Sequence, residues 1–115
     1  MSIDKFEDII AWQKAKLLSI NIYKSFGLCK DYGFRDQIQR ASVSVMNNIA
    51  EGFERKSDVE FSRFLFIAKG SCGEVRSMIY LAFELHYISQ EDSRKYYDLS
   101  IEISKLISGF IKTLR

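Results

Sequence analysis

The chain has 115 residues, of which 17 are Lys or Arg and 15 are Asp or Glu, so its formal net charge is +2. With 47% apolar and 28% charged residues, it is too apolar for disorder and long enough for one globular domain, residues 1–115. No apolar run approaches the roughly 20 residues of a membrane span, and no signal-peptide pattern opens the chain. We therefore expect a cytoplasmic protein without membrane contact. The small charge excess permits an acidic partner without requiring one.

The cysteines and the single histidine do not form a metal-binding pattern. Cys29 and Cys72 lie far apart in the sequence, and His86 is the only histidine, whereas a zinc site takes about four ligands. The Glu-x-x-His motif of di-metal bundles is also absent. We expect free thiols in a reducing compartment, and neither a cofactor nor a small-molecule substrate.

The first half of the chain predicts two helices. Because proline breaks helices, the absence of proline favours long helices with short connections. Apolar residues at helical spacing predict a first helix over about 6–26 and a second over about 34–53, with Asp31 as its N-cap. The predicted apolar stripes are Ala11, Ala15, Leu18, Ile22 and Phe26, and then Ile38, Ala41, Val45, Ile49 and Gly52.

The second half predicts two more helices, each with a capping signal. Ser57 and Glu60 form a capping box before a third helix over about 58–86, and Ser89 with Asp92 repeats that pattern before the fourth. The predicted stripe of the fourth helix is Tyr96, Leu99, Ile103, Leu106, Phe110 and Leu114. Four amphipathic helices with short loops predict an all-α fold, an up-down-up-down antiparallel four-helix bundle.

Polar and small residues interrupt the apolar stripes of the second and third helices. We predict a buried polar cluster of Asn48, Glu51 and Glu74, with Asn48 and Glu74 facing each other or a shared partner and so fixing the pairing of the helices. Because glycine costs stability inside a helix, we interpret Gly52, Gly70 and Gly73 as sites of close helix packing. No nucleophile–base pair accompanies the carboxylates, so we predict no catalytic residues and no enzyme.

Basic residues gather in the middle of the chain. Arg40, Arg55, Lys56 and Arg63 are the candidates for phosphate contact, and Lys69, Arg76 and Tyr80 share one face of the third helix. Basic residues beside an aromatic ring are typical of nucleic-acid contact. The alternative is a solvated surface in which acids such as Glu54, Glu60 and Glu84 are interspersed.

Several separated blocks resemble one known family. They are Phe6-Glu-Asp8, Trp12-Gln-Lys-Ala15, Gln37-Ile-Gln-Arg40-Ala-Ser-Val-Ser44, Asn48-Ile-Ala-Glu-Gly-Phe53 and Gly70-Ser71 with Glu74. In these blocks the chain resembles the four-helix-bundle family encoded in intervening sequences of bacterial 23S ribosomal RNA genes. The resemblance implies a bundle that self-associates, often as a five-membered ring, and it suggests a link to RNA. Met46 and Gly73 depart from the family's usual residues.

Apolar residues off the main stripes also predict self-association. Trp12, Val43 and Met46 are the candidate interface residues, and Ile20, Tyr23, Phe66 and Tyr80 likewise lie off the stripes. Exposed apolar patches normally mark interfaces. We therefore expect a homo-oligomeric interaction module, and the family resemblance implies that five copies are favoured and that the module binds RNA or an RNA-associated protein. The alternative is a protein-only scaffold or accessory subunit, for example of a reverse transcriptase, without nucleic-acid contact.

Overall fold

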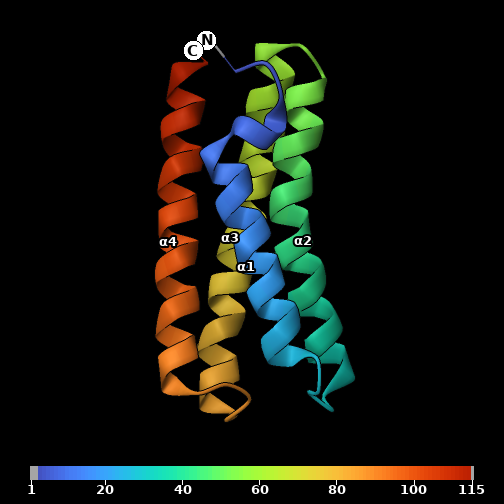
Figure 1. Cartoon of the computed structure of the whole chain (residues 1–115), viewed down its shortest axis with the longest axis vertical. Helices are drawn as coiled ribbons and strands as arrows, with labels where there is room; N and C mark the ends of the chain where they lie inside the picture. The colour runs from blue at the N-terminus through green and yellow to red at the C-terminus, as the bar shows by residue number, and fades with distance from the viewer. Residues whose placement is uncertain (1–2, 115) are drawn as a thin grey trace.

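The computed structural model describes residues 3–114, which form a short 3-10 helix and four α-helices. The elements are η1 (Phe6–Asp8), α1 (Ile10–Phe26), α2 (Tyr32–Glu54), α3 (Asp58–Glu84) and α4 (Gln90–Thr113). They pack side by side into a rod of 43 × 21 × 19 Å (Figure 1). The expected first helix is divided, because Ile9 takes an extended conformation between η1 and α1 and buries its side chain.

Each helix runs antiparallel to the one before it, so both termini lie at the same end of the rod (Figure 1). The helices contact one another in the cyclic order α1–α2–α3–α4–α1. Within residues 3–114, the backbones of α1 and α3 do not meet, and neither do those of α2 and α4. The predicted up-down-up-down bundle is therefore confirmed. It places α1 and α3 at opposite corners of the rod.

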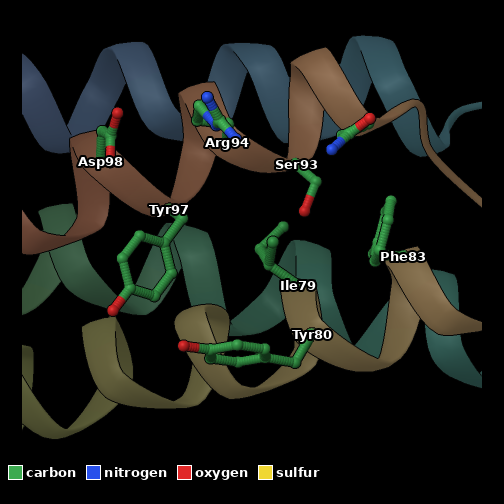
Figure 2. Close-up of a pocket in the computed structure, with 8 residues that line it drawn as sticks. Ile79, Tyr80, Phe83, Ser93, Arg94, Tyr97 and Asp98 are labelled. Carbon is green, nitrogen blue, oxygen red and sulfur yellow. The ribbon is translucent and has the colours of Figure 1, made fainter.

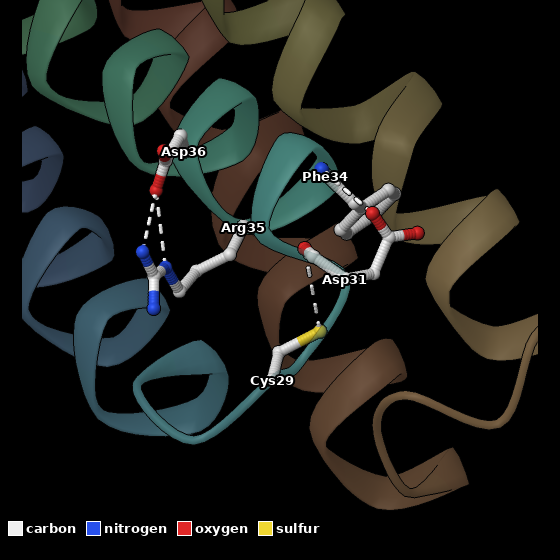
Figure 3. Close-up of polar contacts among 5 residues, drawn as sticks. All are labelled: Cys29, Asp31, Phe34, Arg35 and Asp36. Atoms are coloured by element: carbon white, nitrogen blue, oxygen red, sulfur yellow. Dashed lines mark hydrogen bonds and ion pairs between the residues drawn. The ribbon is translucent and has the colours of Figure 1, made fainter.

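Side-chain caps fix where three of the helices begin. The Asp31 carboxylate accepts a hydrogen bond of 3.1 Å from the backbone N–H of Phe34 at the start of α2 (Figure 3). Ser57 and Ser89 accept equivalent bonds at the starts of α3 and α4. These three caps were predicted from the sequence. Each satisfies a backbone donor that the first turn of a helix leaves without an intrahelical partner.

The core follows the predicted stripes of the first three helices. Every predicted stripe residue of α1 and α2 is buried. The sequence predicts a stripe of Phe61, Phe64, Leu65, Ala68, Cys72, Val75, Ile79 and Ala82 on α3, and all of these are buried except Phe64, which is half-buried. The predicted stripe of α4 is right for Tyr96 and Ile103, which are buried with Ser100, Ile107 and Ile111. Its other members are only partly buried against the core: Leu99, Leu106, Phe110 and Leu114. Ser100 faces the core because its small side chain lets α4 approach α3, where the Cys72 thiol donates to the Ser100 carbonyl at 3.2 Å.

Candidate functional site

Large apolar side chains outside the core are concentrated on two of the four helices. Four lie exposed on α1 and six on α3, whereas α2 exposes only Tyr32, at its first residue, and α4 exposes none over Gln90–Thr113. The exposed residues are Ile10, Leu17, Ile20 and Tyr23 on α1, and Val59, Phe66, Ile67, Tyr80, Leu81 and Phe83 on α3. The candidate site is therefore a pair of surfaces at opposite corners of the bundle.

The first surface, which we call the α1 face, consists of Ile10, Leu17 and Ile20. These residues are separated by seven and three positions, so they lie on one side of the helix. The side chain of Leu17 is 48% exposed. The buried stripe of α1 contacts α2 and α4, and the α1 face lies on the opposite side. No packing inside the bundle requires these residues to be apolar.

The second surface, the α3 face, consists of Val59, Phe66, Ile67 and Leu81, with Gly70 among them. Phe66 is 54% exposed. A Cβ added to Gly70 would meet no atom within 4 Å, so this glycine is a shallow point between large side chains. Apolar patches of this kind mark contact sites on soluble proteins.

The three candidate interface residues from the sequence are less exposed than these two faces. Trp12 packs edge-on against Phe6, with ring centroids 5.1 Å apart, and both rings lie against the core. Met46 also packs against the core, and Val43 is half-buried. Among the other residues that the sequence placed off the stripes, Ile20, Tyr23, Phe66 and Tyr80 are exposed.

The predicted buried polar cluster is wrong for two of its three members. Glu74 is exposed and accepts a hydrogen bond from the Gln37 amide of α2, and Glu51 is exposed and pairs with Arg55 at 3.2 Å. Water reaches the carboxylates of both glutamates, so neither is a buried charge that needs a partner. Asn48 is half-buried but does not meet Glu74.

Asn48 belongs instead to a small hydroxyl network between α2 and α3. Its amide donates to the carbonyl and the hydroxyl of Ser44, one turn earlier, at 2.8 and 2.9 Å. The Ser44 hydroxyl in turn lies 2.9 Å from that of Ser71 on α3. The polar link between the two helices is therefore a serine pair that Asn48 orients.

The three glycines differ in the space around them. A Cβ on Gly52 would lie 2.5 Å from the Cβ of Phe64 and 3.0 Å from a ring carbon of Phe61, so close packing of α2 and α3 requires glycine there. The sequence also predicted close helix packing at Gly70 and Gly73, and within one chain that prediction is wrong for both. Gly70 is open to solvent, and Gly73 would meet only the end of the Arg76 side chain at 3.8 Å. A Cβ at either position would meet no atom of α2 within 4 Å.

The four candidate phosphate-binding cations do not form one surface. Arg40 lies fifteen residues before Arg55 on α2, and at 1.5 Å per residue they are separated by about 22 Å. Arg55 is paired with Glu51 and with Glu60, at 3.2 and 3.7 Å. Lys56 lies over the Phe53 ring, and Arg63 is exposed on α3. Only the residues around the α2–α3 turn are neighbours, and acids accompany them.

A groove between α3 and α4 was not predicted from the sequence. Tyr80 and Phe83 from α3 and Ser93, Arg94 and Tyr97 from α4 line a volume of about 390 Å³ (Figure 2). The sequence placed Arg76 and Tyr80 on one helix face. It gave no signal for the residues of α4 opposite them, because that step depends on the register of the two helices.

The thiols differ in their surroundings. Burial raises the pKa of the Cys72 thiol to about 11, and Cys29 is half-buried in the α1–α2 loop. Among residues 3–114, no group of three or more His, Cys, Asp or Glu side chains is placed to hold a metal ion. None of the helices in this part of the chain is long and apolar enough to cross a membrane.

Comparison with known proteins supports the resemblance seen in the sequence. The family model of the 23S rRNA-intervening sequence proteins matches residues 7–109. The fold is similar to the crystal structure of a protein of unknown function from the S23 ribosomal protein family of Bacteroides thetaiotaomicron VPI-5482. That similarity has a TM-score of 0.83 and 27% sequence identity, and it covers 90% of this chain and 99% of the other. A search of curated proteins gave no match. Since the family model spans most of the sequence, this chain belongs to the family of 23S rRNA-intervening sequence proteins.

Proposed function

We propose that this protein is a non-catalytic, self-associating interaction module, in which the α1 face of one copy packs against the α3 face of the next. The observation that carries this proposal is the distribution of exposed apolar side chains. They occupy α1 and α3 and are almost absent from the outer sides of α2 and α4 over the described residues. Solubility alone would favour polar residues on all four helices.

The size of the rod is sufficient for a stable contact. A standard protein interface buries about 800 Å² on each partner, so a contact of that size would occupy a whole flank of the 43 × 21 × 19 Å rod. Apolar burial contributes about 25 cal/mol per Å², and this gain must exceed the lost freedom of the partners. Gly70 lets a neighbouring copy approach closely, because the surface of α3 is shallow at this glycine, one turn after the exposed side chains of Phe66 and Ile67.

The two faces are different surfaces at opposite corners, so the contact is heterologous. Such contacts close into a ring when the rotation between neighbours allows it. Five copies is the number implied by the family resemblance, and we propose a pentamer on that basis.

Self-association does not by itself say what other molecule the assembled copies bind. We propose RNA or an RNA-associated protein, because the net charge is positive and most lysines and arginines lie outside the four ion pairs of the described residues. A scaffold that contacts protein alone is the alternative. It predicts no salt-dependent binding of RNA.

Sedimentation velocity at micromolar concentrations tests the self-association. The wild-type chain is expected to sediment as a multiple of 13.4 kDa, whereas Leu17→Asp and Phe66→Asp are each expected to shift it towards smaller species. Asn47→Asp is the matched control, because Asn47 is exposed on α2 and the change adds the same charge. A wild-type mass of 13.4 kDa throughout, or an equal effect of the control, would overturn the proposal. Circular dichroism checks that each variant keeps its helices.

A further inference from the structure

The groove between the C-terminal half of α3 and the N-terminal half of α4 combines exposed aromatic rings with cations. Its volume of about 390 Å³ lies within the range of ligand sites. Tyr80 is 60% exposed, which makes it one of the most exposed aromatic side chains of the bundle. The Tyr97 ring meets it edge-on, with centroids 5.6 Å apart and planes at 79° (Figure 2). An edge contact from Tyr97 holds the Tyr80 ring and leaves a face of that ring open.

The neighbouring Tyr97 phenol favours the neutral form of Tyr80. A hydrogen bond with the Tyr97 hydroxyl is the main reason why the pKa of Tyr80 is raised. Tyr80 therefore stays uncharged at physiological pH. An uncharged ring does not repel an anion that lies beside it.

Cations lie along both sides of this groove. Arg94 lines it from α4, and Arg76 lies one turn before Tyr80 on α3, close enough to act on the Tyr80 phenol. Lys69, seven residues before Arg76, and Lys105, eleven residues after Arg94, lie beyond the groove on the same sides of their helices. The ion pairs formed within residues 3–114 use Lys14, Arg35 and Arg55. Arg94 and Arg76, the two cations at the groove, are outside those pairs.

One acid lies at the groove, and its position does not block an anion from the rings. Asp98 is on α4 one turn after Arg94, and both side chains lie on the side of α4 away from Tyr80 (Figure 2). The local charge balance is therefore positive. This contrasts with the α2–α3 turn, where Arg55 is already paired with two glutamates.

We propose that this groove binds a single-stranded polynucleotide, with a base stacked on Tyr80 and the flanking phosphates held by Arg94 and Arg76. Stacking on an aromatic ring and pairing of phosphates with cations are how proteins hold single strands without reading their sequence. The inference rests on the RNA part of the proposed function and gives it a location. Tyr80 is not one of the residues that define the α1 face or the α3 face, so the groove and the self-association are tested with different variants.

Fluorescence anisotropy with labelled 12-nucleotide strands of mixed sequence, one of RNA and one of DNA, tests the groove at 50 mM salt. Loss of one stacked base weakens binding about 5- to 150-fold, which is the expected effect of Tyr80→Leu. Tyr80→Phe keeps the ring and is expected to bind like the wild type. If Tyr80→Leu binds as tightly as Tyr80→Phe, the groove is not the site. The ratio of RNA to DNA affinity then shows whether the 2′-hydroxyl contributes.

The salt dependence separates groove cations from the rest of the surface. Each phosphate contact on a single strand contributes about 0.7 to the slope of log K against log salt. Arg94→Gln and Arg76→Gln are each expected to reduce the slope by about that amount. Arg40→Gln removes the same charge from α2 and is expected to leave it unchanged. An equal effect of Arg40→Gln would overturn the groove as the site.

Two results distinguish failure of this inference from failure of the proposed function. Binding of RNA that none of the groove variants weakens would overturn the groove and leave an RNA partner in place. No binding of either strand at 50 mM salt would overturn both, and would favour a protein partner. Light scattering on every variant shows whether assembly is intact, so that a loss of affinity is not mistaken for dissociation of the copies.

Discussion

Replacing Gly52 by alanine tests how closely α2 and α3 pack. The added methyl group would lie 2.5 Å from the Cβ of Phe64, and real Cβ contacts essentially never come so close. The obstacle is a Cβ, which is fixed to the backbone, so rotation of the phenylalanine ring cannot relieve the contact. The helices must move apart, and Phe61 loses packing against α2 as they do so.

The expected cost follows from two opposing terms. Overpacking a core typically costs about 1–3 kcal/mol, and the upper half of that range applies because the contact is with backbone-fixed atoms. Alanine recovers about 1 kcal/mol relative to glycine inside a helix. The expected net loss is therefore about 1–2 kcal/mol. With an unfolding entropy of about 2.1 cal/mol/K per residue, 1 kcal/mol corresponds to about 4 °C in this chain of 115 residues.

Gly109→Ala is the matched control, because a Cβ there would meet nothing within 4 Å. It gains the helix propensity without the contact, so it is expected to stabilise by about 0.8–1 kcal/mol. Urea unfolding of both variants at one protein concentration gives the difference, expected to be about 2–3 kcal/mol from these two estimates. Equal stabilisation by both substitutions would refute the close packing at Gly52.

Three further changes test other contacts. Asn48→Ala should alter the free energy of unfolding by less than about 1 kcal/mol. The hydrogen bonds it loses lie within one helix, and the better helix propensity of alanine offsets them. A loss above about 2 kcal/mol in urea unfolding would show that Asn48 also holds α2 and α3 together. The hydrogen bond from Tyr87, and then that from Phe34, lowers the pKa of Asp31 below its ordinary 3.8. The stability from that carboxylate is therefore present above pH 3.8 and lost as the pH falls through the lowered pKa, and Tyr87→Phe should flatten this acid-side loss in thermal melts. Because burial raises the pKa of Cys72 to about 11, a thiol reagent at pH 8 should modify Cys29 first, and mass spectrometry should find Cys72 modified only after unfolding.

The buried stripes were predictable because helical period and capping act locally. Asp31, Ser57 and Ser89 are recognisable from residue type and spacing, and the structure places each at a helix start. The stripe of α4 was partly misplaced because Leu99 and Leu106 are as apolar as Ile103. Only the approach of α3 decides that Ser100 faces inward.

Pairing between helices was harder to predict than the helices themselves. Glu74 follows an apolar stripe in the sequence, but whether it is buried depends on how α2 packs beside it, and it lies exposed next to Gln37 near the start of α2. Gly52 and Gly70 both stand inside predicted helices, and nothing in the sequence distinguishes their surroundings. In the structure Gly52 faces Phe64 and Gly70 faces solvent. The α3–α4 groove needs the register of two helices, which no residue pattern within one helix contains.

Mixing two disabled variants tests the heterologous contact most directly. Leu17→Asp damages the α1 face and keeps the α3 face, whereas Phe66→Asp does the reverse. Each variant alone is expected to have a mass near 13.4 kDa, and an equimolar mixture measured by light scattering is expected to form a pair of twice that mass. A mixture that stays at 13.4 kDa, from variants that both retain their helices, would contradict packing of the α1 face on the α3 face.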